Sequence, residues 1–329
     1  MTDVLERAPR QAQPRWAAPM LAVLTAERFS SRDWVYERKL DGERRLAFRR
    51  RDNLRLLSRT RQRLNGTYPE VAEALQAEIC DDFVVDGEVV AFEGAQTSFP
   101  RLQQRMQLRD PERARRSGVR VFYYVFDLLH LEGHDTTNLP LRERKRLLRR
   151  ALSLHAAPLR HLAHRNAEGE RFYREACRRG WEGIIAKRAD SPYRPGRSRD
   201  WLKFKCVKGQ EFVIGGYTDP AGKRIGFGAL LVGYHDARGR LRYAGKVGTG
   251  YSNAALRELG TCLARIEQEE PPFVRDQLPR SAVHWVRPEL VAQIGFTEVT
   301  GDGKLRHPRF LGLRRDKDPR DVVLERPER

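Results

Sequence analysis

The sequence predicts an α+β fold in which strands with flanking helices form a larger N-terminal part and a small antiparallel β-barrel follows. Two observations favour this class. Up to Lys205, runs rich in Val, Phe and Tyr alternate with segments whose apolar residues recur at helical spacing. After Lys205, short strand-like runs are punctuated by Gly and Asp, which is typical of a small barrel with an inserted helix. We therefore expect a domain boundary near residues 206–210.

The composition limits the class of protein. A chain of 329 residues suffices for two domains, and 40% hydrophobic with 33% charged residues indicates a globular chain. The 63 Lys and Arg residues exceed the 44 Asp and Glu residues and give a net charge of +19, which favours a polyanionic partner. An anionic membrane is the competing partner, but the sequence shows no run of about 18 apolar residues and no signal peptide. We therefore expect no membrane association.

The first elements are expected in the following order. Residues 1–15 are rich in Pro, Arg and Gln, which predicts a loose segment. Between residues 34 and 48, β-like stretches flank the turn signal Asp41-Gly42, which predicts a hairpin or a strand–turn–strand unit. Apolar residues at helical spacing predict a helix over 68–79, with Pro69 tolerated in its first turn.

Later segments complete the prediction. Residues 82–92 and 119–133 are rich in Val, Phe and Tyr and predict buried strands, and residues 141–152, behind Pro140, predict a basic helix. Beyond the boundary, Ser252 is placed to cap a helix. The strand-like runs EFVIGGYTD, ALLVGYHD and RLRYAGKVGTG begin at residues 211, 229 and 240.

The cysteines give no sign of a metal site. The chain contains Cys80, Cys177, Cys206 and Cys262, and no two of them form a Cys-x-x-Cys pair. This pattern predicts neither a zinc site nor a disulfide framework. We therefore expect a reducing cytoplasm as the location.

The stretch YERKLDGERRLAFRR, residues 36–50, raises the question whether Lys39 is a nucleophile. In so basic a chain most lysines are solvated, and a match to Lys-x-Asp-Gly-x-Arg at 39–44 arises by accident with odds on the order of one in a hundred. Five further motifs follow it along the chain. Together with the first they make six matches in the expected order, which makes coincidence untenable. These motifs are Asp86-Gly87-Glu88, Phe126-Asp127, Glu182-Gly183 with Lys187, Lys203 and Lys205 at alternate positions of one strand, and Arg314 with Asp316 and Lys317.

In these residues the chain resembles the covalent nucleotidyltransferases, specifically the ATP-dependent DNA ligases. QEFVIGGYT (210–218) and LRHPRFLGLRRDK (305–317) resemble in particular the ligase domain of the bacterial end-joining ligase D and its stand-alone relatives. The resemblance implies a nucleotidyltransferase (adenylation) domain of antiparallel sheets with flanking helices over 16–207 and a C-terminal OB-fold β-barrel over 208–329. The polymerase and nuclease modules of ligase D do not occur in this sequence, so a minimal ligase and a fragment both remain open.

The chemistry of such an enzyme explains why a lysine stands in the first motif. An amine attacks the α-phosphorus of ATP only when it is neutral. With a pKa of about 10.4, roughly one lysine in 10³ is neutral at pH 7, which corresponds to about 4–5 kcal/mol. We expect nearby cations, namely Lys203, Lys205 and a bound Mg²⁺, to lower the pKa of Lys39. Glu37 and Asp41 would raise it if they lay against the amine, so we expect them to face the nucleotide.

The resemblance also implies a role for each remaining motif residue. Lys39 takes AMP covalently from ATP, Glu37 reads the adenine amino group, and Phe126 stacks on the base. Other basic residues contact the sugar or the phosphates of the nucleotide: Arg44, Arg59, Lys187, Lys203 and Lys205. Glu88 contacts ribose and metal, and Glu182 holds a divalent ion, Mg²⁺ or Mn²⁺. Arg314, Asp316 and Lys317 lie in the barrel and orient pyrophosphate when the barrel closes over ATP.

These features predict an ATP-dependent DNA ligase that seals 5′-phosphate/3′-hydroxyl breaks in repair or end joining through a lysyl-AMP and a DNA-adenylate. An RNA ligase or an mRNA-capping guanylyltransferase is the first alternative, although Glu37 with Phe126 favours adenine. A DNA-binding scaffold with an inactive nucleotidyltransferase domain is the second. The expected partners are nicked or broken double-stranded DNA and an end-binding repair protein. We expect a monomer at the bacterial nucleoid.

Overall fold

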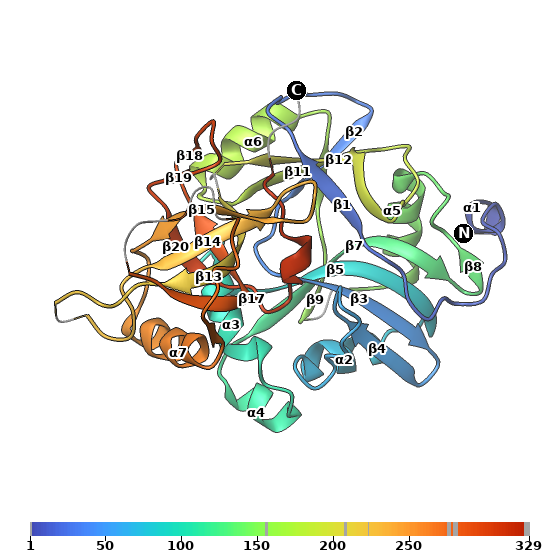
Figure 1. The fold of residues 1–329 in the computed structure, drawn as a ribbon. Coiled ribbons are helices and arrows are strands. Elements are labelled where there is room, and N and C mark those ends of the chain that lie inside the picture. Colours follow the sequence, from blue (N-terminus) through green and yellow to red (C-terminus); the bar gives the residue numbers. More distant parts are fainter. Residues whose placement is uncertain are drawn as a thin grey trace. The chain divides into compact units, whose positions relative to one another are not determined.

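The computed structural model describes residues 2–154, 157–206, 209–222, 224–274, 278 and 282–325. The chain divides into two compact units, of which the first ends at Cys206 and the second at Glu325 (Figure 1). Each unit is described below by itself. Among the described residues, no helix is both long enough and apolar enough to cross a membrane.

The larger sheet of the first unit is built around the two long strands that the sequence predicts. Its order is β4-β3-β5-β7-β8, with β6 paired to β5 and β9 paired to β7. Both long strands are buried along most of their length, because their Val, Phe and Leu residues face apolar layers on both sides. The bounds are β3 (Glu43–Arg50), β4 (Asn53–Leu57), β5 (Asp82–Glu93), β6 (Gln96–Thr97), β7 (Val121–Leu131), β8 (His134–Asp135) and β9 (Leu159–His161).

The smaller sheet of the first unit contains strands from the N-terminal and the C-terminal parts of that unit's sequence. Its order is β1-β12-β11-β2-β10, and β1 runs parallel to β12 while the other neighbours are antiparallel. The bounds are β1 (Met20–Leu24), β2 (Trp34–Arg38), β10 (His164–Asn166), β11 (Gly183–Arg188) and β12 (Gly196–Lys205).

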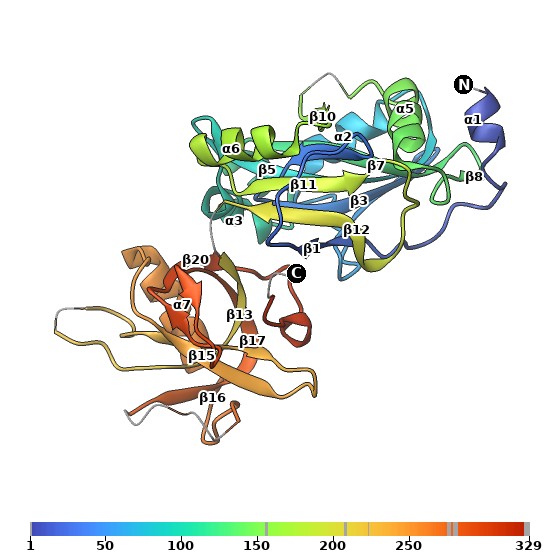
Figure 2. The same ribbon diagram turned by 90° about the horizontal axis from the view of Figure 1, so that it is seen from above.

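Helices α2, α3 and α5 pack on the larger sheet, and α6 packs on the smaller sheet (Figure 2). Leu75 of α2, Leu102 of α3 and Leu147 of α5 share one core with the larger sheet. A second core, with Phe126 and Trp201, lies between the two sheets, and Phe172 of α6 packs on the outer face of the smaller sheet. The bounds are α1 (Thr2–Glu6), α2 (Pro69–Gln76), α3 (Phe99–Met106), α4 (Pro111–Arg116), α5 (Leu141–Ala151) and α6 (Gly169–Arg178).

The second unit is a curved antiparallel sheet with an inserted helix, as predicted. Its order is β15-β14-β13-β17-β16, with β20 paired to β17 and a separate β18–β19 pair. Ser252 caps α7 by accepting a hydrogen bond from the Ala255 amide at 3.2 Å. The bounds are β13 (Gly209–Tyr217), β14 (Leu230–His235), β15 (Leu241–Val247), α7 (Asn253–Ala264), β16 (Glu267–Gln268), β17 (His284–Gly295), β18 (Glu298–Val299), β19 (Leu305–Arg306), β20 (Arg309–Leu313) and the 3₁₀ turn η2 (Pro319–Asp321).

Two local predictions differ from the structure. Strands flank Asp41-Gly42, which confirms the strand–turn–strand alternative, but they do not form the hairpin: β2 pairs within the smaller sheet and β3 within the larger one. Residues 1–15 were expected to be loose, yet Leu5 and Ala8 are buried in the first core. The Gln13 amide also donates hydrogen bonds to the Arg49 carbonyl (2.7 Å) and the Asp82 carboxylate (3.0 Å). Packing against the larger sheet therefore outweighs the polar composition of this segment.

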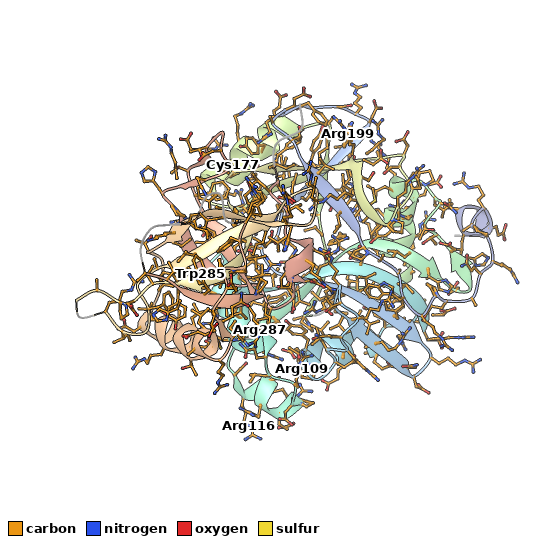
Figure 3. All side chains as sticks on the ribbon, viewed as in Figure 1. Arg109, Arg116, Cys177, Arg199, Trp285 and Arg287 are labelled. Atoms are coloured by element: carbon orange, nitrogen blue, oxygen red, sulfur yellow. A yellow bond between two sulfur atoms is a disulfide. The ribbon has the colours of Figure 1, made fainter. Side chains whose placement is uncertain are left out.

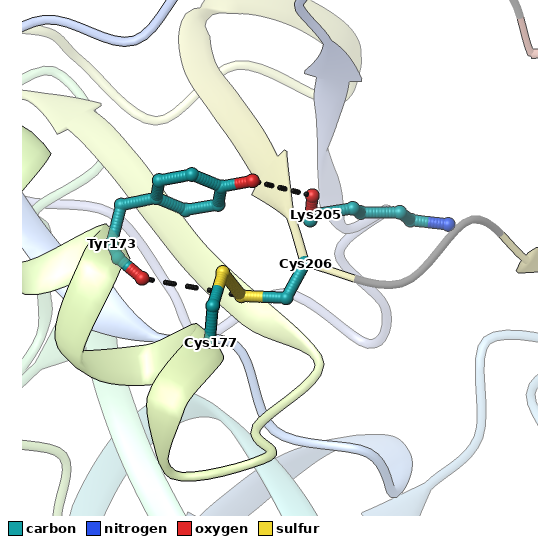
Figure 4. The surroundings of a disulfide bond; sticks show 4 residues. All are labelled: Tyr173, Cys177, Lys205 and Cys206. Atoms are coloured by element: carbon teal, nitrogen blue, oxygen red, sulfur yellow. Dashed lines mark hydrogen bonds between the residues drawn. A yellow bond between two sulfur atoms is a disulfide. The ribbon is translucent and has the colours of Figure 1, made fainter.

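The expectation of no disulfide is wrong. Cys177 on α6 and Cys206, directly after β12, form a disulfide with their Cα atoms 5.2 Å apart (Figure 4). They lie 29 residues apart in the sequence and meet because α6 packs on the smaller sheet, so no spacing motif announces them. Beside them, the Tyr173 hydroxyl donates a hydrogen bond to the Lys205 carbonyl at 3.1 Å. The disulfide therefore fixes α6 to the end of the strand that carries Lys203 and Lys205.

Candidate active site

Lys39 lies directly after β2, where the first unit changes from one sheet to the other. Its backbone amide donates a hydrogen bond to the Gly183 carbonyl at 2.9 Å, which ties the motif to the start of β11. Its side-chain amine forms an ion pair with the Glu182 carboxylate. The two side chains are 21% and 23% exposed, so a ligand can reach the pair.

Two motif glycines are required by close approaches of the backbone. A Cβ at Gly42 would lie 2.3 Å from the Val89 carbonyl oxygen of β5. Gly183 adopts a φ of +146°, and a Cβ there would lie 2.0 Å from the Phe204 carbonyl oxygen. The glycines therefore let the loops of Lys39 and Glu182 approach their neighbouring strands closely.

The charges around Lys39 differ from the expectation. Burial acts to lower the pKa of its amine, but Glu182, followed by Asp41 and Glu88, outweighs burial and raises the pKa above the ordinary lysine value. The predicted lowering by Lys203 and Lys205 is therefore not found in the ligand-free chain, because carboxylates and not lysines lie nearest to the amine. Lys39 is held as an ammonium.

A second group of charges is buried behind Lys39. The carboxylate of Glu37 on β2 forms ion pairs with Lys145 of α5 and, at 2.7 Å, with Lys187 of β11. All three side chains are at most 6% exposed. Burial acts to raise the pKa of Glu37, but the two lysines outweigh it and hold the pKa below its ordinary value. Glu37 is therefore a buried carboxylate anion that does not touch Lys39.

Two aromatic rings enclose the ammonium of Lys187. Its Nζ lies 4.2 Å from the ring centroid of Phe126 and 3.8 Å from that of Trp201. The rings meet edge to face at 6.1 Å. Burial is the main cause that lowers the pKa of Lys187 to about 8, against the opposing effect of Glu37. Phe126 therefore already contacts a cation in the ligand-free chain.

Arg44 also lies against the Phe126 ring. Its guanidinium donates two hydrogen bonds to Asp86, at 2.6 and 2.5 Å, and lies 4.7 Å from the Phe126 ring centroid. Asp86 also accepts a hydrogen bond from the Tyr193 hydroxyl at 2.6 Å. Burial acts to lower the pKa of Arg44, but Asp86 outweighs it and the pKa is raised. Arg44 is thus a fixed cation at the edge of the inter-sheet core.

The other predicted residues of the first unit lie on strands or loops around this group. Lys203 pairs with Ile185 and Lys205 with Gly183 across β11 and β12, so both lysines share one face of β12 next to Glu182. Glu88 lies opposite Arg44 across β3 and β5. Arg59 is half-buried in the turn after β4.

The C-terminal triplet forms its own ion cluster in the second unit. The Arg314 guanidinium donates hydrogen bonds to both carboxylate oxygens of Asp316, each at 2.9 Å. Lys317 Nζ lies 3.2 Å from Glu211 Oε1, and Arg314 Nη1 lies 3.7 Å from the same oxygen. Glu211, at the start of β13, therefore holds both cations of the motif.

Four further residues of the site have no predicted role: Lys145, Trp201, Tyr193 and Asp86, of which only Asp86 is named within a motif. Asp86 and Trp201 stand beside predicted residues in the motifs that contain Glu88 and Lys203, and Lys145 stands in the predicted basic helix. Nothing in the local sequence signals their role, because each meets its partner across a long separation, such as the 108 positions between Lys145 and Glu37.

The carboxylates near Lys39 suit a hard divalent cation. Glu182 forms an ion pair with the Lys39 ammonium, and Asp41 and Glu88 also act on the pKa of this amine. Among the described residues, no group of three or more His, Cys, Asp or Glu side chains is placed to hold a metal ion. Proteins usually hold Mg²⁺ with one or two carboxylates and phosphate oxygens of the substrate, and Glu182 offers a carboxylate of this kind beside Lys39.

Comparison with known proteins gives matches along most of the chain. The family model described as "ATP dependent DNA ligase domain" matches residues 19–205, and the one described as "ATP dependent DNA ligase C terminal region" matches residues 223–317. The multifunctional non-homologous end joining protein LigD of Pseudomonas aeruginosa is 37% identical over 320 residues, which cover 95% of this chain and 37% of that protein. The LigD of Mycolicibacterium smegmatis is 34% identical over 324 residues, covering 96% of this chain and 41% of that protein.

A solved structure is also similar. The mycobacterial DNA ligase D complexed with ATP and MES shares 34% identity with a TM-score of 0.65, and the match covers 94% of this chain and 98% of that one. By contrast, the chain spans only about two fifths of the length of the two curated relatives.

Proposed function

The chain belongs to the ATP-dependent DNA ligases, and from this premise we propose that it joins broken DNA strands in end joining through a covalent adenylate on Lys39. The predictions of an ATP-dependent DNA ligase, with an adenylation domain and a C-terminal OB domain, are confirmed by the family matches. The alternatives of an RNA ligase, a capping guanylyltransferase and an inactive scaffold find no support in these matches.

One observation carries the assignment of the nucleophile. The Lys39 side chain is 21% exposed, whereas the side chain of Lys187, the other lysine of the first-unit site with a shifted pKa, is 2% exposed and enclosed by rings. In the proposed first step the Lys39 ammonium loses one proton to solvent, while Glu182, which is also proposed to hold the metal, stays ionised. The neutral nitrogen then forms a bond to the α-phosphorus of ATP, the bond to pyrophosphate breaks, and the nitrogen loses a second proton to solvent. In the second step the DNA 5′-phosphate oxygen takes the AMP from Lys39. In the third step the 3′-hydroxyl attacks that phosphate and AMP leaves.

The nucleotide roles are proposed for residues that surround Phe126. Glu37 accepts a hydrogen bond from the adenine amino group, and Phe126 stacks on the base. Because Arg44 and Lys187 already lie against the Phe126 ring, a bound base must share the ring with them or displace one of them. The remaining cations, Arg44, Arg59, Lys187, Lys203 and Lys205, hold the sugar and phosphates.

We propose that Glu182 and Glu88 would hold Mg²⁺ or Mn²⁺, which supplies neutralising charge for the phosphates. Arg314, Asp316 and Lys317 would orient the pyrophosphate when the OB domain closes over ATP. The functional domains are proposed as 16–207 and 208–329. Nicked or broken double-stranded DNA is the proposed substrate, an end-binding repair protein the proposed partner, and a monomer at the bacterial nucleoid the proposed working form.

The adenylate on Lys39 can be tested directly. Purified protein incubated with ATP and Mg²⁺ should gain the mass of one AMP, and peptide mapping should place it on Lys39. Lys39→Ala should lose the adduct and the ATP-driven sealing of nicks, yet still seal a pre-adenylated nick, because that step needs no lysine nucleophile. Lys246→Ala, which removes an exposed lysine of the barrel, serves as the control. An AMP found on another residue, or an adduct formed equally well from GTP, would refute the assignment.

A further inference from the structure

Helix α5 contacts the two residues that are proposed to meet the base. We propose that Lys145 of this helix is a positioning residue that orients Glu37 and so sets the preference of the site for a purine that carries a 6-amino group. This inference rests on the proposed adenylation function. Lys145 stands in the basic helix that no step of the proposed reaction uses.

One buried ammonium links the carboxylate and the strand that carries the ring. Lys145 is 5% exposed, forms an ion pair with Glu37 Oε1, and donates a hydrogen bond to the Phe126 carbonyl oxygen at 3.0 Å. Glu37 lies on β2 and Phe126 on β7, in different sheets. A single side chain therefore fixes the distance between the proposed amino-group acceptor and the proposed stacking ring.

The helix itself is held by other contacts. The neighbouring Arg144 donates hydrogen bonds to both carboxylate oxygens of Asp127, at 2.7 and 3.0 Å, and to the Leu139 and Ser191 carbonyls. Leu147 and Leu148 are buried in the main core. Loss of the Lys145 charge is therefore expected to disturb Glu37 more than the position of α5.

The arrangement leaves Glu37 able to accept one more hydrogen bond. Lys145 forms an ion pair with Oε1 and Lys187 lies 2.7 Å from Oε2, so each carboxylate oxygen faces one lysine and has a second lone pair that can accept a hydrogen bond. A carboxylate anion accepts hydrogen bonds and donates none, so it suits an amino group and repels a carbonyl oxygen at the same position of the base. Without Lys145, Glu37 would keep Lys187 alone as its cation and would no longer be held toward the base.

The test compares ATP with purine riboside triphosphate, which lacks the amino group. For each triphosphate, the rate constant of lysyl–nucleotide formation and the apparent dissociation constant are measured in single-turnover experiments. The first divided by the second is the efficiency with that triphosphate, and the preference is the ratio of the two efficiencies. A hydrogen bond to a charged acceptor predicts a wild-type preference for ATP on the order of tenfold to a hundredfold. We expect Lys145→Met to lower this preference about tenfold and Lys145→Arg to restore part of it. Both substrates are measured on one preparation, so a loss of folded protein cancels in the ratio.

Three controls separate the outcomes. Arg146→Met removes the charge of the next, exposed residue of α5 and should keep the wild-type preference. Glu37→Ala should lose the preference, and adding Lys145→Met to it should change nothing further. If Lys145→Met slows both triphosphates equally, or if Glu37→Ala keeps the preference, this inference is overturned while the adenylate on Lys39 stands. If the wild type forms no adduct on Lys39, the proposed function fails and the inference fails with it.

Discussion

At the scale of single residues, the proposed nucleophile of this site is held in its unreactive form. The Lys39 ammonium is paired with Glu182, and Asp41 and Glu88 add to the effect that raises its pKa. Because only the neutral amine attacks, adduct formation should become faster as the pH rises toward that raised pKa. The carboxylates proposed to bind a divalent cation are therefore also the groups that keep the Lys39 amine protonated, and so unreactive, while no ligand is bound.

Glu182→Gln removes the carboxylate with the largest effect on Lys39, so the pKa of the amine should fall. A larger neutral fraction at each pH should make Lys39 react faster with an amine-directed acylating reagent in the absence of nucleotide and metal. Mass analysis of the Lys39 peptide over a pH series should show the inflection at lower pH than in the wild type. Glu88→Gln is the matched control and should produce a smaller shift, because Glu88 contributes least among the named carboxylates. An unchanged inflection in Glu182→Gln would contradict the ion pair.

At the scale of the elements, the disulfide between α6 and the end of β12 is a covalent tie next to the site. It closes a segment of 29 residues, and the chain-entropy model assigns such a loop about 3–4 kcal/mol of stability.

Replacing both cysteines, in Cys177→Ser/Cys206→Ser, should lower the thermal midpoint of the first unit by on the order of 10 °C. Calorimetry in non-reducing buffer measures this, and reduction of the wild type should give a similar loss. Cys80→Ser, which changes a free cysteine of the same unit, is the control. Four titratable thiols in the unreduced wild type would show that the tie does not form in solution.

The elements also show what the sequence can and cannot predict. The hydrophobic runs of β5 and β7, the helix α5 and the Ser252 cap were found, because each signal lies within about ten consecutive residues. The partners of Lys145 and the bond between Cys177 and Cys206 were missed, because they depend on how distant segments pack. The motif residues could be named from the order of the motifs, but the pairing of Lys39 with Glu182 could not.

At the scale of the whole molecule, the proposed closing of the OB domain separates the chemical steps. Pyrophosphate has left before a pre-adenylated nick is sealed, so a residue that contacts it matters only for the attack on ATP. Lys317→Ala should therefore slow formation of the enzyme adenylate by about 10²-fold, or about 3 kcal/mol, and leave the sealing of a pre-adenylated nick nearly unchanged. Arg315→Ala removes a neighbouring charge outside the motif and should change neither rate much. Equal loss in both steps for Lys317→Ala would refute this role.

The excess of positive charge belongs to the molecule as a whole. The net charge is +19, and exposed arginines such as Arg109, Arg116 and Arg199 extend from the ribbon (Figure 3). Four or more phosphate contacts predict that affinity for nicked DNA falls at least about 10²-fold between roughly 50 and 200 mM monovalent salt. Fluorescence anisotropy without divalent ions measures this slope. A flat response would mean that binding does not rest on phosphate contacts.

The strand order of the smaller sheet determines when this sheet can be completed during translation. Its strands run from Met20 to Lys205, and β12, the last to be made, is the strand that joins β1 to β11. At typical translation rates of about 5–20 residues per second, β12 leaves the ribosome roughly ten to thirty seconds after Lys39. Until then β1 has no neighbour in the sheet, and Glu182 itself is made late in the same interval. In a nascent chain Lys39 is therefore synthesised before Glu182 and β12, so it still lacks the neighbours that distinguish it from the other lysines.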